Sequence, residues 1–121
     1  MSRTNPGPID LVHLARQSGG DSTLEHELLA LFADQCIRHL ATIRSAQSRS
    51  GMEAAHTLKG AARAIGAWGV ADAAEKVEHA LSSAGAAQMA APNPAPLAGL
   101  DELSRATDAA RAAIALMARA A

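Results

Sequence analysis

Aromatic residues are almost missing from this sequence of 121 residues, which contains one Trp, one Phe and no Tyr. Strands favour aromatic and β-branched side chains, whereas alanine, which is frequent here, is the best helix former. Hydrophobic residues still make up 49% of the chain, so a core can be built from Ala, Leu, Ile, Val and Met. The composition therefore predicts an all-α protein.

Three further absences narrow the class of protein. Cys36 is the only cysteine, which excludes an internal disulfide and a cysteine-based zinc cluster. The formal net charge is −1, so no bulk positive field would hold nucleic acid or an anionic membrane. No stretch resembles a signal peptide or approaches the roughly 18 apolar residues of a membrane span. We expect a cytoplasmic monomer that binds neither nucleic acid nor membrane.

A short leading helix is expected before the main part of the chain. Residues 1–8 are polar and contain two prolines, which predicts a flexible lead-in. Asp10 can cap a helix over the sequence LVHLARQ, which stops at a Ser-Gly-Gly sequence beginning at Ser18.

A long helix is predicted over about residues 23–48. Ser22 and Glu25 have the S-x-x-E spacing of a capping box at its start. Apolar residues then recur at intervals of three and four, as they do on one face of a helix. This stripe consists of Leu24, Leu28, Phe32, Cys36, Leu40 and Ile43. Within it, Cys36 is expected to be a small core residue.

A further helix is predicted over about residues 51–67, where Ser50 and Glu53 offer another capping box. Its inward face is expected to consist of Ala55, Leu58, Ala62 and Ile65. Glycines on either side of Trp68 mark a turn, and the indole is expected to cover the end of the helical bundle.

Two more amphipathic stripes follow, one ending near Gly85 and the other reaching about residue 119. Between them, residues 86–99 carry three prolines and are expected to form a crossover loop. The stripes are Val70, Ala74, Val77 and Leu81, then Leu100, Leu103, Thr107, Ala110, Ile114 and Met117. Four such helices can bury their stripes only against each other. Residues 1–121 are therefore predicted to form one domain, an antiparallel four-helix bundle with a short additional N-terminal helix.

The most informative segment is H-T-L-K-G-A-A-R-A-I-G, which begins at His56. With the apolar positions turned inward, His56, Lys59, Gly60 and Arg63 share the outward face of their helix. An exposed imidazole is a nucleophile near neutral pH, and a lysine one turn away can neutralise phosphoryl oxygens. A glycine inside a helix costs about 1 kcal/mol relative to alanine, but here it leaves room for a partner to close over the histidine. The spacing indicates a phosphorylatable histidine.

This segment resembles the signature of histidine-containing phosphotransfer (Hpt) domains, in which H-x-L-K-G is followed by a small residue and a second glycine. The similarity extends through residues 70–78 and the long helix before the motif. The resemblance implies that His56 is phosphorylated on Nε2, that Lys59 stabilises the phosphoryl group and that Gly60 gives access. It also implies that a receiver domain supplies the acceptor aspartate and Mg²⁺, so the chain needs no cofactor or metal of its own.

The function predicted is that of a phosphorelay intermediate, which accepts a phosphoryl group on His56 from a receiver aspartate and passes it to another receiver. The expected partners are response-regulator receiver domains and a sensor or hybrid histidine kinase. No P-loop ending follows the glycines after His56, so no ATP-dependent kinase activity is expected. Arg63 is either a partner contact or an ordinary surface residue. The remaining histidines, expected at surface or boundary positions, are His13, His26, His39 and His79.

Three other classes of helical protein share some of these features. The dimerisation helix of a histidine kinase typically has an acidic residue after its histidine, whereas Thr57 follows His56. The isolated phosphoacceptor domain of a chemotaxis-type histidine kinase shares the fold and the motif, and stays open as an alternative. A metal-binding bundle is disfavoured, because Glu75 and Glu78 precede His79 without a matching second half.

Overall fold

The computed structural model describes residues 7–45, 48–82 and 97–120, and every regular element in these ranges is an α-helix. The expectation of an all-α protein is confirmed. The elements are α1 (Leu11–Ser18), α2 (Ser22–Ser45), α3 (Ser48–Ile65), α4 (Trp68–Ala80) and α6 (Leu100–Ala120).

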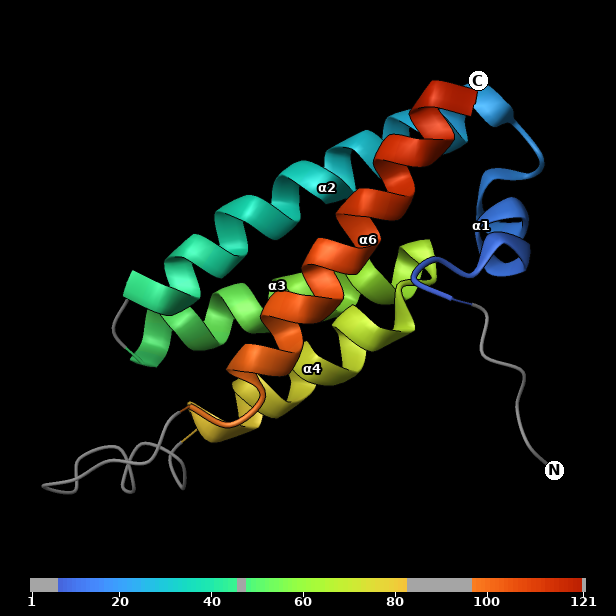
Figure 1. Cartoon of the computed structure of the whole chain (residues 1–121). Helices are drawn as coiled ribbons and strands as arrows, with labels where there is room; N and C mark the ends of the chain where they lie inside the picture. The colour runs from blue at the N-terminus through green and yellow to red at the C-terminus, as the bar shows by residue number, and fades with distance from the viewer. Residues whose placement is uncertain (1–6, 46–47, 83–96, 121) are drawn as a thin grey trace, which may run out of the picture.

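The four long helices form a ring in which neighbouring helices run in opposite directions (Figure 1). α3 packs between α2 and α4, and α6 closes the ring by packing against α4 and α2. The short α1 lies at one end, where it contacts α2 and α3. This is the predicted antiparallel bundle with an additional N-terminal helix.

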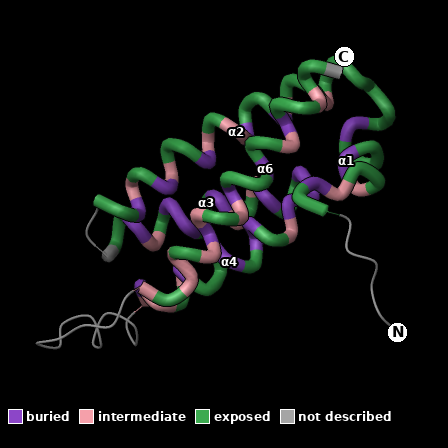
Figure 2. Tube along the Cα trace, viewed as in Figure 1, coloured by how far each residue is buried: buried purple, intermediate pink, exposed green. Residues whose placement is uncertain are grey.

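The interior of the ring is built from small and aliphatic side chains, and buried positions face inward along each helix (Figure 2). All residues predicted to form the inward face of α3 are buried, as are all those predicted for α4. Alanines make up much of the buried face of α3 and α4, and their small side chains leave room for neighbouring helices to pack closely. These buried alanines are Ala54, Ala55, Ala62, Ala71, Ala73 and Ala74.

The start of α2 differs from the prediction. The prediction of a capping box formed by Ser22 and Glu25 is wrong. Asp21 caps the helix, because its Oδ1 accepts the hydrogen bond from the Leu24 amide at 3.0 Å. Glu25 instead accepts a hydrogen bond from the Ser18 hydroxyl at 2.7 Å. The inward face also begins elsewhere: Leu24 is 37% exposed, and the core face of the helix begins at Leu29. In the described residues α2 extends to Ser45, and residue 48, the predicted limit, already belongs to α3.

The prediction that Ser50 and Glu53 form a capping box is wrong as well. The helix α3 already includes Ser48, so Ser50 lies inside it and cannot be its cap. Gly51 is buried in the first turns of α3. A β-carbon there would lie 3.1 Å from Leu81 Cδ1 and 3.8 Å from the Ile43 backbone. The glycine thus lets α3 pack against the ends of α2 and α4, and it does not end a helix.

The turn between α3 and α4 is shorter than predicted and contains Gly66 and Ala67, while Trp68 already belongs to α4. Gly66 has φ of +88°, a conformation that glycine adopts without strain. Its carbonyl accepts a hydrogen bond from the Asp10 amide at 2.9 Å, which ties the start of α1 to this turn.

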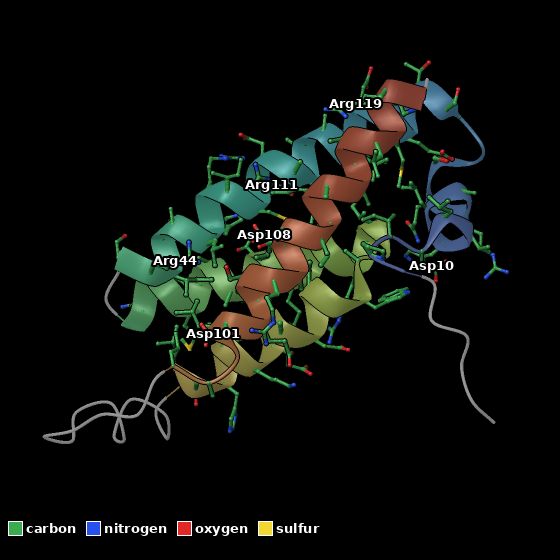
Figure 3. All side chains as sticks on the ribbon, viewed as in Figure 1. Asp10, Arg44, Asp101, Asp108, Arg111 and Arg119 are labelled. Carbon is green, nitrogen blue, oxygen red and sulfur yellow. The ribbon has the colours of Figure 1, made fainter. Side chains whose placement is uncertain are left out.

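Asp10 caps α1 as predicted, since Oδ1 accepts from the His13 amide at 3.1 Å. Its second oxygen, Oδ2, accepts from Trp68 Nε1 at 2.9 Å, and the His13 ring packs edge-on against the indole. Trp68 therefore covers the end of the bundle, as expected. Figure 3 shows Asp10 at this end, on the segment that leads into α1.

Parts of two predicted loops lie outside the described residues. Of the lead-in at 1–8 only Gly7 and Pro8 are described, and of the crossover loop at 86–99 only residues 97–99. Gly85, near which the stripe beginning at Val70 was predicted to end, also lies outside the described residues, and α4 itself ends at Ala80. Gly99, with φ of +86°, begins the turn into α6.

Candidate functional site

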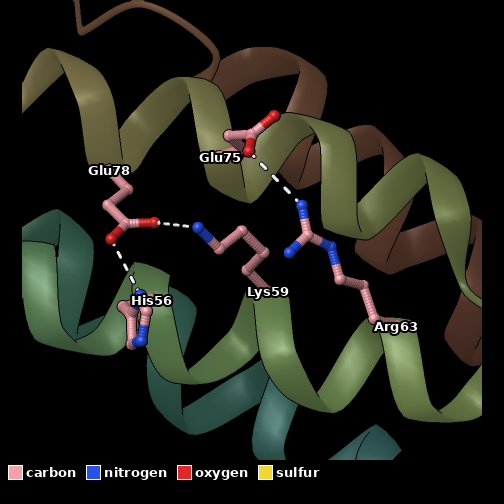
Figure 4. A network of polar contacts seen from close by, with 5 residues as sticks. All are labelled: His56, Lys59, Arg63, Glu75 and Glu78. Carbon is pink, nitrogen blue, oxygen red and sulfur yellow. Dashed lines mark hydrogen bonds and ion pairs between the residues drawn. The ribbon is translucent and has the colours of Figure 1, made fainter.

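The motif begins in the middle of α3, and the structure places His56, Lys59 and Arg63 on the side of this helix that faces α4 and solvent (Figure 4). His56 is well exposed, with 68% of its side chain accessible, and Gly60 and Arg63 are exposed too. Lys59 differs from the expectation of an outward cation, because only 15% of its side chain is accessible. It is covered at the seam between α3 and α4.

Glu78 on α4 joins the two central residues of the motif. Its Oε2 lies 2.8 Å from His56 Nδ1, and its Oε1 lies 2.6 Å from Lys59 Nζ (Figure 4). Glu78 Oε1 is buried from solvent, so the Lys59 ammonium takes the position next to it that water would otherwise occupy. One carboxylate therefore holds both the imidazole and the ammonium.

The protonation of this cluster follows from the charge of Glu78. Contact with the Lys59 ammonium lowers the pKa of the Glu78 carboxyl, partial burial opposes this, and the His56 hydrogen bond lowers it further. An ionised carboxylate can only accept hydrogen bonds, so His56 Nδ1 must carry the proton of the pair. In a neutral imidazole the other nitrogen, Nε2, then has a free electron pair. Glu78 thereby leaves Nε2 as the ring nitrogen with the free electron pair.

The register between α3 and α4 is what brings Glu78 to His56. The turn at Gly66 is tight, and it connects the helices with Ala67 as the one residue between Gly66 and α4. Behind the site, Leu58 and Val77 are fully buried. Since Lys59 directly follows Leu58 and Glu78 directly follows Val77, the packing of the core fixes where each helix presents these charges.

Gly60 lies one turn after His56 in ordinary right-handed helix, because it is absent from the glycines with positive φ. A β-carbon built there meets no heavy atom of the described residues within 4 Å beyond its own helix backbone. Neither backbone conformation nor packing among the described residues requires a glycine here. The space above it is open to an approaching molecule.

Arg63, a further turn along α3, forms an exposed ion pair across the same seam. Its Nη2 donates to Glu75 Oε1 at 3.3 Å, and both side chains are more than half accessible (Figure 4). Beside His56, on the side toward the start of α3, lies a shallow open groove. It is lined by Met52, Glu53, His56, Thr57 and Glu78.

A known protein family matches most of this chain, including the helices that carry the cluster around His56. The family model of the Hpt domain matches residues 27–113 of the 121-residue chain. The chain belongs to the Hpt domain family. Hpt domains carry phosphoryl groups on a histidine in phosphorelay signalling, where they interact with receiver domains and kinases. No curated protein and no solved structure matches the chain closely enough to add a relative.

The matched range of the Hpt domain contains all of α3 and α4, hence the whole cluster around His56. In the part of the chain that the structure describes, no helix is long and apolar enough to cross a membrane. The described residues also hold no group of three or more His, Cys, Asp or Glu side chains placed to bind a metal ion.

The other histidines of this Hpt domain lie in different surroundings. His26 and His79 are exposed, and His13 and His39 are partly buried, in line with the expected surface and boundary positions. Burial lowers the pKa of His39. Cys36 is a core residue as expected, and its burial raises the pKa of the thiol to about 11, which keeps it protonated and unreactive.

The sequence did not identify Glu75 and Glu78 as members of the site, although both fall in the stretch 70–78 that resembles the Hpt family. A usable signal exists in retrospect. Glu78 directly follows Val77, a core residue of α4, and Glu75 lies about one turn earlier on the same side, so both emerge along one edge of the buried face. At such an edge they meet the charges at the edge of a neighbouring helix. The neighbour could not be identified from the spacing on α4 alone.

Proposed function

We propose that this Hpt domain works as a phosphorelay intermediate in which His56 Nε2 accepts a phosphoryl group from the aspartyl phosphate of one receiver domain and passes it to the aspartate of another. The observation that carries the proposal is the 2.8 Å contact between Glu78 Oε2 and His56 Nδ1. It leaves Nε2 as the free nitrogen on an exposed side chain.

The transfer step uses this arrangement directly. The Nε2 electron pair attacks phosphorus, an N–P bond forms, and the P–O bond to the receiver aspartate breaks with its electron pair kept by that carboxylate. The imidazole becomes positively charged as it donates its electrons. Glu78, hydrogen-bonded to Nδ1, is placed to stabilise this charge, much as a carboxylate stabilises the imidazolium of a hydrolase triad. Transfer to the second receiver reverses the same steps.

Lys59, Gly60 and Arg63 have supporting roles in the proposal. Lys59 holds Glu78 in its charged form and contributes positive charge within one turn of the phosphoryl group. Gly60 leaves open space where the receiver must approach, and Arg63 lies on the surface that the receiver covers. Mg²⁺ is supplied by the receiver, and the chain has no kinase activity of its own. Positioning and charge stabilisation are what phosphoryl transfer mainly requires from a protein.

The test is to label the protein with phosphoramidate and with a phosphorylated receiver domain. The modification should be acid-labile and base-stable, as expected of a phosphoramidate bond. His56→Gln should abolish labelling by both donors and leave the helical circular dichroism unchanged, since the side chain is exposed. His79→Gln is the matched control, because His79 is another exposed histidine and should be dispensable. Labelling that survives His56→Gln would exclude His56 as the acceptor.

A further inference from the structure

The two ion pairs that cross the α3–α4 seam near His56 differ in how firmly they are held. Lys59 and Glu78 are largely covered, with 15% and 24% of their side chains accessible, and their charged atoms lie 2.6 Å apart. Arg63 and Glu75 are 54% and 58% accessible and lie 3.3 Å apart. The outer pair is therefore in contact with water on most sides.

The outer pair contributes little to holding α3 against α4. Those helices already pack through buried side chains such as Leu58 and Val77, and exposed ion pairs typically contribute between 0 and about 1 kcal/mol. Exchange of either partner for a charge on another molecule is therefore inexpensive. The Lys59–Glu78 pair, in contrast, cannot open without leaving Glu78 Oε1 buried and unpaired.

The position of the outer pair puts it under any molecule that docks on His56. Arg63 is seven residues after His56 on the same helix, a rise of about 10 Å. A specific interface covers about 800 Å² on each partner, or a disc of about 16 Å radius, so its footprint around His56 includes Arg63. Gly60 lies between the two and has open space above it, which lets the docked surface come close to the helix there.

We infer that the ion pair of Arg63 and Glu75 selects the receiver domain by the direction of its charges, and we call this pair the polarity mark. When the receiver docks, the two side chains separate. A carboxylate of the receiver then pairs with Arg63 on α3, and a cation of the receiver pairs with Glu75 on α4. This inference rests on the proposed function and adds to it the residues that set partner choice. The pair has a direction, positive on α3 and negative on α4. Complementary charges steer encounter and like charges oppose it, so a receiver with the opposite polarity is rejected.

The test reverses the direction of the charges in the Arg63–Glu75 pair while keeping an ion pair at this position. Arg63→Glu and Glu75→Arg each place like charges together, whereas the double variant restores an ion pair with opposite direction. The donor is a phosphorylated receiver domain that exchanges with the unaltered protein, and each rate is divided by the labelling rate with phosphoramidate. The control is the reversal of Lys76 and Glu102, an exposed ion pair between α4 and α6 at 3.0 Å.

Each single reversal should lower the normalised rate about tenfold at low salt, the size of a rim-charge effect on association, and the double reversal should stay at least as low. The Lys76 and Glu102 reversal should leave the rate unchanged. Recovery of the rate in the double variant would show that only the internal ion pair matters, and unchanged rates in the single variants would show that the receiver does not contact it. Either result overturns the inference.

The same measurements separate this inference from the proposed function. If phosphoramidate labels His56 but no receiver exchanges with the unaltered protein, the proposed partner is wrong and the inference falls with it. If receivers exchange normally and the reversals have no effect, the relay function stands and the polarity mark alone is refuted.

Discussion

The ammonium of Lys59 lies 2.6 Å from one oxygen of Glu78, and the other oxygen of Glu78 accepts a hydrogen bond from His56. The lysine of the motif thus acts on the histidine through a residue of another helix. Lys59 keeps Glu78 charged, and the charged Glu78 fixes the proton on Nδ1. We expect the contact of Glu78 with His56 to affect the rate of phosphoryl acceptance, and its contact with Lys59 to affect the stability of the fold.

Replacing Glu78 with Gln should slow phosphoryl acceptance without disturbing the fold. A hydrogen bond to a charged group contributes about 1.5–3 kcal/mol, so losing the charge predicts a fall of roughly 10- to 100-fold in the phosphoramidate labelling rate. Nitrogen-15 NMR of the imidazole should show the Nδ1–H tautomer in the unaltered protein and a mixture in the variant.

The control for this variant is Asp72→Asn, the same type of change at an exposed position of α4. It should leave both the labelling rate and the His56 tautomer as they are. A Glu78→Gln protein that labels at the normal rate would mean that the carboxylate does not assist the reaction.

Lys59→Met should destabilise the protein at neutral pH and much less in acid. The substitution keeps an apolar stem but leaves Glu78 Oε1 buried without a cation, at an expected loss of about 1 kcal/mol for a partly buried pair. Because the pKa of Glu78 is lowered on folding from 4.5, the unfolded chain takes up a proton first as the pH falls. The stabilisation that the Lys59–Glu78 ion pair contributes is therefore complete above the unfolded-state pKa of 4.5, and it is lost as the pH falls through the lower pKa of the folded state.

The measurement is thermal unfolding of both proteins at pH 7 and pH 3. The difference in Tm between unaltered and Lys59→Met protein should narrow at pH 3, because Glu78 of the unfolded chain takes up a proton below 4.5 and this uptake favours unfolding. A difference that is equal at both pH values would assign the effect of Lys59 to packing of its stem.

The sequence predicted those features that depend on one helix at a time. The inward face of α3 at Leu58 and Ala62 follows from local periodicity, and the cap at Asp10 follows from neighbouring residues. The contact between Glu78 and His56 could not be predicted, because it depends on the register of α4 against α3, which the turn at Gly66 and the buried alanines set together.

The capping errors have a similar cause. Asp21 and Ser22 are both good N-cap residues, and spacing alone favoured Ser22 because Glu25 follows it three positions later. In the structure Glu25 serves the Ser18 hydroxyl at the end of α1, a partner that lies in a different helix. A tertiary contact decided between two locally acceptable caps.

Asp10→Asn should loosen α1 from the bundle while preserving its cap. Asparagine caps helices as well as aspartate, so its oxygen can still accept from the His13 amide. Its amide group would then face Trp68 Nε1–H, so that two donors meet. The expected results are a lower Tm and a shift in the fluorescence of Trp68, the single tryptophan of the chain.

Asp21→Asn provides the comparison, because Asp21 caps α2 through one oxygen and no contact with Trp68 is involved. It should change neither the Tm nor the fluorescence appreciably. Both variants should be labelled by phosphoramidate at the normal rate, since α1 lies at the end of the bundle, away from the middle of α3. An Asp10→Asn protein with unchanged fluorescence would show that the indole is not held by Asp10.

Gly60 gives the sharpest test of docking, because it is in ordinary helix and has free space where a side chain would go. Gly60→Ala should raise the free energy of unfolding by up to about 1 kcal/mol, since alanine replaces a poor helix former without a clash. Gly60→Gln should fold at least as well as the unaltered protein for the same reason. Its longer side chain, however, would fill the space between His56 and an approaching receiver.

Transfer from a phosphorylated receiver to Gly60→Gln should therefore be slowed at least tenfold, the size of a loss of about 1.4 kcal/mol in transition-state stabilisation. Phosphoramidate is small and should be hindered much less, so the ratio of the two rates separates docking from chemistry. Ala109→Gln, at an exposed position of α6, controls for adding a glutamine to a helix surface. If Gly60→Gln unfolds the protein, the glycine is needed for packing. If it folds and accepts phosphoryl groups from the receiver normally, the receiver does not pass over this turn of α3.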